Sequence, residues 1–138
     1  LEPIARHGNK PQILKFDSHE EEIQGIANLI SDFKKSGYKS LGIVCKTESQ
    51  AKELAEKLKL YTNDIHFLSN QSSAFIQGII ITSAHMAKGL EFDEVIIPQA
   101  NDNNYYSEID KNMLYVAVTR AMHLLTLTYY ENPTKYIQ

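Results

Sequence analysis

The sequence predicts an α/β domain in which a mostly parallel β-sheet is flanked by helices. Short apolar runs typical of buried strands alternate with amphipathic helical patterns, which is the order that βαβ units produce. The 138 residues suffice for one domain with a hydrophobic core. A hydrophobic content of 43% is typical of a folded chain. We therefore expect residues 1–138 to form a single domain.

The first half of the chain predicts strands at 12–16, 41–46 and 65–68, separated by two helices. Ser18 and Glu21 form a capping-box pattern before a stripe of apolar residues at helical spacing, and Gly37 is a natural stop. Thr47 and Gln50 repeat the capping pattern before a second helical stripe, which runs to residue 58.

The second half predicts a loop at 69–74, a central strand at 77–82 and another strand at 93–97. Residues 99–107 are rich in Asn and Asp, as exposed loops are. A helical stripe from Ile109 to Ala121 follows, and alternation over 124–129 predicts the last strand.

Charge and cysteine content exclude several classes of protein. The net charge is -3, so no general basic surface indicates nucleic acid, and residues 71–138 hold only four cations. No apolar run has membrane-spanning length, which predicts no membrane partner. The single cysteine, Cys45, is expected to be a buried, inert thiol in a cytoplasmic protein.

Polar residues gather directly after the central strand. The run from Thr82 to Phe92 carries hydroxyls, an imidazole, an ammonium and a carboxylate, and we expect all of them at one sheet edge. In open α/β sheets the edge beyond the carboxyl ends of the strands is where ligands bind. A second run, 114–121, places one arginine, Arg120, on an otherwise apolar helix.

These two runs resemble motifs V and VI of the second, C-terminal RecA-like (2A) domain of superfamily 1 DNA helicases of the UvrD, Rep and helicase IV group. Motif V of that family reads Thr-x-His-x-x-Lys-Gly-Leu-Glu-Phe, and motif VI reads Tyr-Val-x-x-Thr-Arg-Ala. We match motif V to Thr82, His85, Lys88, Gly89, Leu90, Glu91 and Phe92, and motif VI to Tyr115, Val116, Thr119, Arg120 and Ala121. The resemblance implies a three-layer RecA-like fold and the second motor domain of an ATP-dependent helicase or translocase.

The resemblance also implies a role for each matched residue. Arg120 is the expected catalytic residue, an arginine finger at the γ-phosphate of ATP. Gly89 and Glu91 complete the expected ATP contacts. The expected DNA contacts are Thr82, Ser83, His85 and Lys88.

The family's remaining parts are not found in this sequence. No Gly-x-x-x-x-Gly-Lys-[Ser/Thr] P-loop occurs, so ATP with Mg²⁺ is expected on an N-terminal RecA-like partner domain of the same protein. No metal site is expected here, and the accessory 2B domain has no room in the loop at 69–74. The resemblance therefore implies that this segment alone is inactive, and that single-stranded DNA is the second partner.

Other interpretations remain open. The chain is alternatively a non-catalytic helicase-derived module that binds another protein, for example RNA polymerase. Arg120 is alternatively a surface arginine and His85 a structural histidine. Tyr105 and Tyr106 could stack on bases or pack within a loop. A Rossmann-type enzyme is disfavoured because no Gly-x-Gly-x-x-Gly follows a strand.

Overall fold

The computed structural model describes residues 10–69 and 77–138, and its strands form one sheet in which every pair of neighbours is parallel. The order across the six-stranded sheet is β1-β6-β5-β2-β4-β3. The strands are β1 (Gln12–Phe16), β2 (Ser40–Cys45), β3 (Ile65–Phe67), β4 (Gly78–Ser83), β5 (Phe92–Ile97) and β6 (Ala121–Tyr130). The predicted α/β class and parallel sheet are confirmed.

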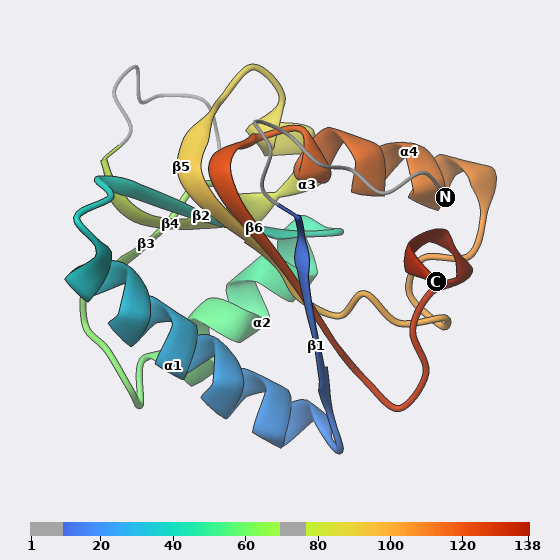
Figure 1. Cartoon of the computed structure of the whole chain (residues 1–138), viewed down its shortest axis with the longest axis horizontal. Helices are drawn as coiled ribbons and strands as arrows, with labels where there is room; N and C mark the ends of the chain where they lie inside the picture. The colour runs from blue at the N-terminus through green and yellow to red at the C-terminus, as the bar shows by residue number, and fades with distance from the viewer. Residues whose placement is uncertain (1–9, 70–76) are drawn as a thin grey trace.

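Helices cover both faces of the sheet, which makes three layers (Figure 1). The α-helices are α1 (His19–Ser36), α2 (Glu48–Leu58), α3 (Ala84–Ala87) and α4 (Glu108–Val118), and a short 3₁₀ helix, η1 (Lys135–Ile137), follows β6. One core lies between the sheet and α1 and α2. The other lies between the sheet and α3 and α4, and it holds the fully buried rings of Phe92 and Tyr105. Burial on both faces explains why the strands read as continuous apolar runs.

The helix boundaries follow the capping signals in the sequence. The side chains of Ser18 and Thr47 accept hydrogen bonds from the third residue of α1 and of α2, as predicted. Gly37 ends α1 in the left-handed conformation, with φ of +87°.

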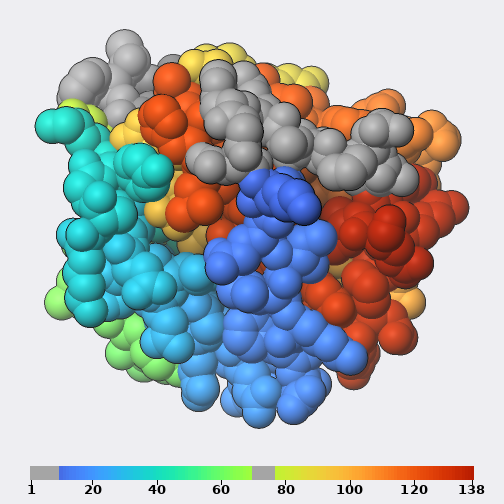
Figure 2. All heavy atoms as spheres, viewed as in Figure 1, coloured from blue at the N-terminus to red at the C-terminus, as the bar shows by residue number. Residues whose placement is uncertain are grey.

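At the edge of the sheet, the blue atoms of β1 and of the start of α1 lie on the surface (Figure 2).

Two predicted boundaries differ from the structure. The helical stripe was expected to reach Ala121, but α4 ends at Val118 and Ala121 is the first residue of β6. The backbone N–H of Phe92 donates to the carbonyl of Arg120 at 2.9 Å, which draws the chain into the sheet at this point. The expected loop at 69–74 lies mostly outside the described residues, and within the described ranges no helix is long and apolar enough to cross a membrane.

Phe92 occupies space that a side chain on β2 would otherwise fill. A Cβ atom placed on Gly42 would lie 2.5 Å from the Phe92 ring. Phe92 is fully buried and is the first residue of β5, directly after the Gly89–Leu90–Glu91 segment. The Phe92 ring therefore packs into the space above Gly42, and this packing positions the end of the segment against the sheet.

We predict that Gly42→Ala lowers the free energy of unfolding by about 1 to 3 kcal/mol, because the added methyl group overpacks the core against a ring. Urea unfolding followed by circular dichroism measures this change. Phe92→Leu removes part of the ring, so the double variant should lose less than the sum of the two single losses. Strict additivity would show that Gly42 and Phe92 do not compete for the same space.

Candidate functional site

The segment from Ser83 to Phe92 crosses one face of the sheet and does not stay at one edge. Ser83 is the last residue of β4, and Phe92 is the first residue of β5. Because these strands are parallel to β2 between them, the chain must return from the carboxyl edge to the amino edge. The expectation of a single polar cluster at the carboxyl edge is therefore wrong: Ser83 lies at that edge, and Glu91 lies at the opposite one.

The two hydroxyl residues at the end of β4 are both buried. Thr82 is fully buried, and its Oγ1 donates to the carbonyl of Leu68 at 2.7 Å. The Oγ of Ser83 accepts from the backbone N–H of Met86 at 3.2 Å and so caps α3. Ser83 stands two residues before His85, as the threonine does in motif V. The match of Thr82 to that threonine is therefore wrong by one residue, and its hydroxyl holds β4 to the end of β3.

His85 and Lys88 are exposed on and after α3. They border a hollow of about 220 Å³ between α3 and α4. The hollow is lined by Ala84, His85, Lys88, Ile109, Asn112, Met113 and Val116. The helix cap at Ser83 thus aims two basic side chains at a mostly apolar depression on the surface.

Arg120 lies directly after α4 and contacts the end of the preceding crossover. Its Nε donates to the carbonyl of Val116 at 3.2 Å, and its Nη1 donates to the carbonyl of Leu90 at 3.1 Å. Nη2 donates to Oγ1 of Thr119 at 3.1 Å. The guanidinium is half-buried. The two sequence motifs, thirty positions apart, are therefore in direct contact through Arg120 and Leu90.

The residues beside this contact are open to solvent. Glu91 and Gly89 are exposed, and Gly89 has a φ of +83°, a conformation that side chains with a Cβ rarely adopt. Register pairing of Phe92 with Ala121 places Glu91 and Arg120 at the starts of neighbouring strands. The Glu91 carboxylate and the Arg120 guanidinium thus lie at the amino edge of β5 and β6. Gly89, which has no side chain, is close to them in the chain.

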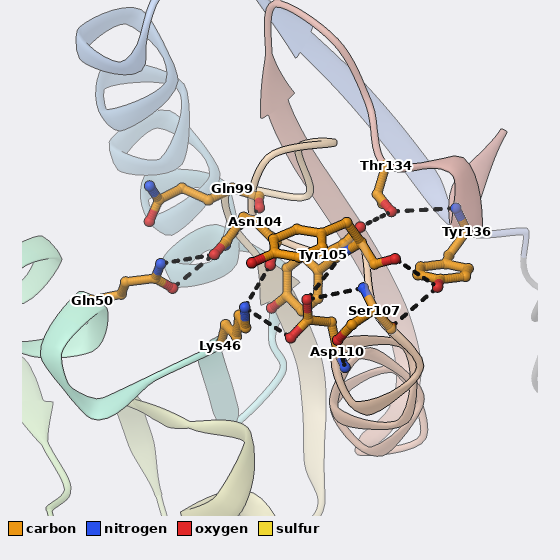
Figure 3. A network of polar contacts seen from close by, with 10 residues as sticks. Lys46, Gln50, Gln99, Asn104, Tyr105, Ser107, Asp110, Thr134 and Tyr136 are labelled. Carbon is orange, nitrogen blue, oxygen red and sulfur yellow. Dashed lines mark hydrogen bonds and ion pairs between the residues drawn. The ribbon is translucent and has the colours of Figure 1, made fainter.

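A polar network that sequence reasoning missed supports the start of α4 (Figure 3). Nζ of Lys46, directly after β2, bonds to the Asp110 carboxylate at 2.8 Å and to the carbonyl of Asn104 at 2.7 Å. Gln50 donates to the side chain of Asn104 at 2.9 Å. Asp110 also forms a capping box with Ser107. The Ser-x-x-Asp spacing at 107–110 is the signal in the sequence that could have located this helix start.

Burial and hydrogen bonding perturb three groups in and beneath this network. Burial alone would raise the pKa of Asp110, but hydrogen bonds from Lys46 and from the N–H groups of Tyr106 and Ser107 outweigh it and lower the pKa to about 2. Burial raises the pKa of Tyr105 and of Cys45, so both stay protonated. Within the described ranges, the Tyr105 hydroxyl is the buried side-chain polar atom without a hydrogen-bond partner.

Comparisons with known protein sequences identify a family and individual proteins that the chain is similar to. The family model for the UvrD-like helicase C-terminal domain matches residues 61–132. The chain is 33% identical to DNA helicase II of Escherichia coli strain K12 over 76 residues, which is 48% of this chain and 11% of that protein. It is 34% identical to F-box DNA helicase 1 of Gallus gallus over 102 residues, which is 62% of this chain and 9% of that protein. The chain therefore spans about a tenth of the length of these curated relatives.

Solved structures share the fold. The C-terminal domain of a possible DNA helicase from Lactobacillus plantarum WCFS1 superposes with a TM-score of 0.82 at 24% identity, covering 92% of this chain and 78% of that one. The SWI2/SNF2 ATPase core of Sulfolobus solfataricus, solved with double-stranded DNA, gives a TM-score of 0.61 at 17% identity over 85% of this chain and 27% of that one. These likenesses place the sheet and its helices in the RecA-like fold of helicase domains.

We predict that Asp110→Ala lowers the free energy of unfolding by about 2 to 4 kcal/mol, because it removes one half of the capping box and leaves the largely buried Lys46 charge with no carboxylate, only the carbonyl of Asn104. Denaturant unfolding measures the loss. The matched control is Glu53→Ala, which breaks the exposed 3.5 Å pair with Lys57 and should change stability by less than about 0.5 kcal/mol. Equal effects of the two substitutions would show that Lys46 relaxes into solvent.

Proposed function

Because the chain belongs to the family of UvrD-like helicase C-terminal domains, we propose that it is the second motor domain of an ATP-dependent DNA helicase or translocase. The observation that carries the proposal is the hydrogen bond from Arg120 to the carbonyl of Leu90, beside the exposed Glu91. It joins the two family motifs into one surface at the amino edge of the sheet. In this proposal ATP with Mg²⁺ is held mainly by an N-terminal RecA-like domain that carries the P-loop.

Arg120 suits a role as the arginine finger. A guanidinium has five N–H groups, and Arg120 uses three of them to hold its own position against Val116, Leu90 and Thr119. The remaining two would reach the γ-phosphate, where charge spreads over the equatorial oxygens during transfer. A guanidinium held in place before the reaction stabilises that charge without reorganisation at the moment of transfer.

Glu91 and Gly89 suit contacts to the nucleotide on the same surface. The exposed carboxylate of Glu91 can accept hydrogen bonds from the sugar hydroxyls. Gly89 presents only backbone, and among the described residues, its two chain neighbours apart, no atom lies within 4 Å of where its Cβ would be, so a ligand could approach closely here. Glu91 and Gly89 are thus assigned to nucleotide contacts in this proposal.

His85 and Lys88 suit contacts to the phosphate backbone of single-stranded DNA, with Ser83 placing them by capping α3. Residues 84–91 connect this surface directly to the nucleotide contact at Glu91. A shift of the Leu90–Arg120 contact on ATP binding would therefore move α3 through a single short segment. This connection supports the proposal of a motor in which the state of the nucleotide changes the affinity for DNA.

A second candidate is a non-catalytic module that binds another protein, for example RNA polymerase. The observation that favours it is charge: residues 71–138 hold seven acids against four cations. The upstream part of the reading frame separates the two proposals: a P-loop followed by an acidic metal-binding motif favours the motor, and the absence of both favours the module.

We predict that the isolated 138-residue chain hydrolyses ATP no faster than buffer, with or without single-stranded DNA, because the phosphate-binding loop lies elsewhere. A phosphate-release assay measures this directly. DNA-stimulated turnover by the isolated chain would overturn the proposed division of the ATP site between two domains.

In the protein that carries both domains, we predict that Arg120→Ala lowers the rate of ATP hydrolysis by about 10³- to 10⁵-fold while nucleotide affinity changes little. Arg120→Lys should also lose most of the rate, because an ammonium lacks the planar fork of the guanidinium. Lys59→Ala, on an exposed lysine at the end of α2, is the control. A loss of nucleotide binding equal to the loss of rate would assign Arg120 to ground-state binding.

A further inference from the structure

Tyr105 and Tyr106 are adjacent in the sequence and have opposite environments in the structure. Tyr105 is fully buried in the core beneath α4, whereas the Tyr106 side chain is 63% exposed. We propose that Tyr106 is a stacking platform for a base of single-stranded nucleic acid. This contact rests on the proposed function and extends the surface of His85 and Lys88 around the start of α4.

The backbone beneath the Tyr106 ring is fixed on both sides. Its N–H donates to Oδ2 of Asp110 at 3.0 Å, and its carbonyl accepts from the hydroxyl of Tyr136 at 3.2 Å. Nζ of Lys46 lies 5.6 Å from the ring centroid, a cation–π distance. An exposed tyrosine on a rigid backbone loses little conformational entropy when it binds, because only its two side-chain torsions remain to be ordered.

Two hollows lie on the surface near the start of α4, and the Tyr106 ring lines one of them. The hollow beside His85 and Lys88 is walled by Ile109, itself 72% exposed. A second hollow of about 350 Å³ lies between Tyr106 and the end of the chain. It is lined by Asp102, Tyr105, Tyr106, Asn132, Pro133, Lys135 and Gln138. Exposed apolar side chains between two depressions form a surface on which flat bases can lie.

The placement of cations favours nucleic acid over a protein as the occupant. Four cations occur in 77–138; Arg120 is the proposed finger, and the other three are Lys88, Lys111 and Lys135. Lys88 and Lys135 border the two hollows. The Nζ atoms of Lys111 and Lys135 lie 5.9 and 5.4 Å from the centroid of the Tyr136 ring, which is itself buried. Lysine is depleted at protein–protein interfaces, whereas an exposed aromatic ring near cations is typical of single-strand binding.

The test is the affinity of the 138-residue chain for a short oligothymidylate, measured by fluorescence anisotropy. Tyr106→Ala should weaken binding by roughly 5- to 150-fold, the effect of losing one stacked base. Tyr106→Phe keeps the ring and should bind as the unchanged chain does. Tyr61→Ala, on a tyrosine 49% exposed after α2, is the matched control and should have no effect. With an abasic oligonucleotide the Tyr106→Ala variant should bind as tightly as the unchanged chain, because no base remains to stack.

The outcomes separate this inference from the proposed function. If His85→Ala and Lys88→Ala weaken binding but Tyr106→Ala does not, the DNA surface stands and the stacking platform is refuted. The ring would then be assigned to a protein contact. If the unchanged chain does not bind the oligonucleotide, both the DNA surface and the platform are refuted. Equal melting temperatures of the unchanged chain and the Tyr106→Ala variant would show that a loss of affinity is not a loss of folding.

Discussion

The parallel pairing of β5 with β6 is the constraint on which the candidate site depends. Pairing of Phe92 with Ala121 brings the residues just before both strands to the same edge of the sheet. Leu90 and Arg120 then lie within hydrogen-bond distance, and the guanidinium closes the gap between them. The buried Phe92 ring packs over Gly42 of β2, where a side chain would leave no room for it, and this packing positions the start of β5 against β2. A core packing requirement thus sets the geometry of a polar surface.

The crossover from β4 to β5 is unusually short for a connection between parallel strands. Most connections between parallel strands need a dozen or more residues, usually with a full helix. Here residues 84–91, with the four-residue helix α3, span the sheet face. Such a segment has little slack between its two ends. Under the proposed function, the DNA end at His85 and the nucleotide end at Glu91 are coupled mechanically by this lack of slack.

The sequence predicted the elements well where local chemistry decides, and less well where tertiary contacts decide. Capping residues such as Ser18 and Thr47, and continuous apolar runs, located helices and buried strands. The strand order was not readable, because it depends on which runs meet across the core. Ala121 was assigned to a helix since it continues the apolar stripe, but a sheet hydrogen bond at Arg120 overrides that stripe. Lys46 was missed because its partner, Asp110, lies 64 positions away and in another layer.

Neighbouring residues of the same or similar type have different roles in the structure, because their tertiary environments differ. Thr82 and Ser83 are adjacent buried hydroxyl residues, yet one fastens β4 to β3 and the other caps α3. Tyr105 and Tyr106 divide between core and surface. In a domain with a net charge of -3, attraction of phosphate by bulk charge is weak. Under the proposed function, recognition would come from a few cations and one ring held in fixed positions, and the Lys46–Asp110 pair holds the start of α4 in place.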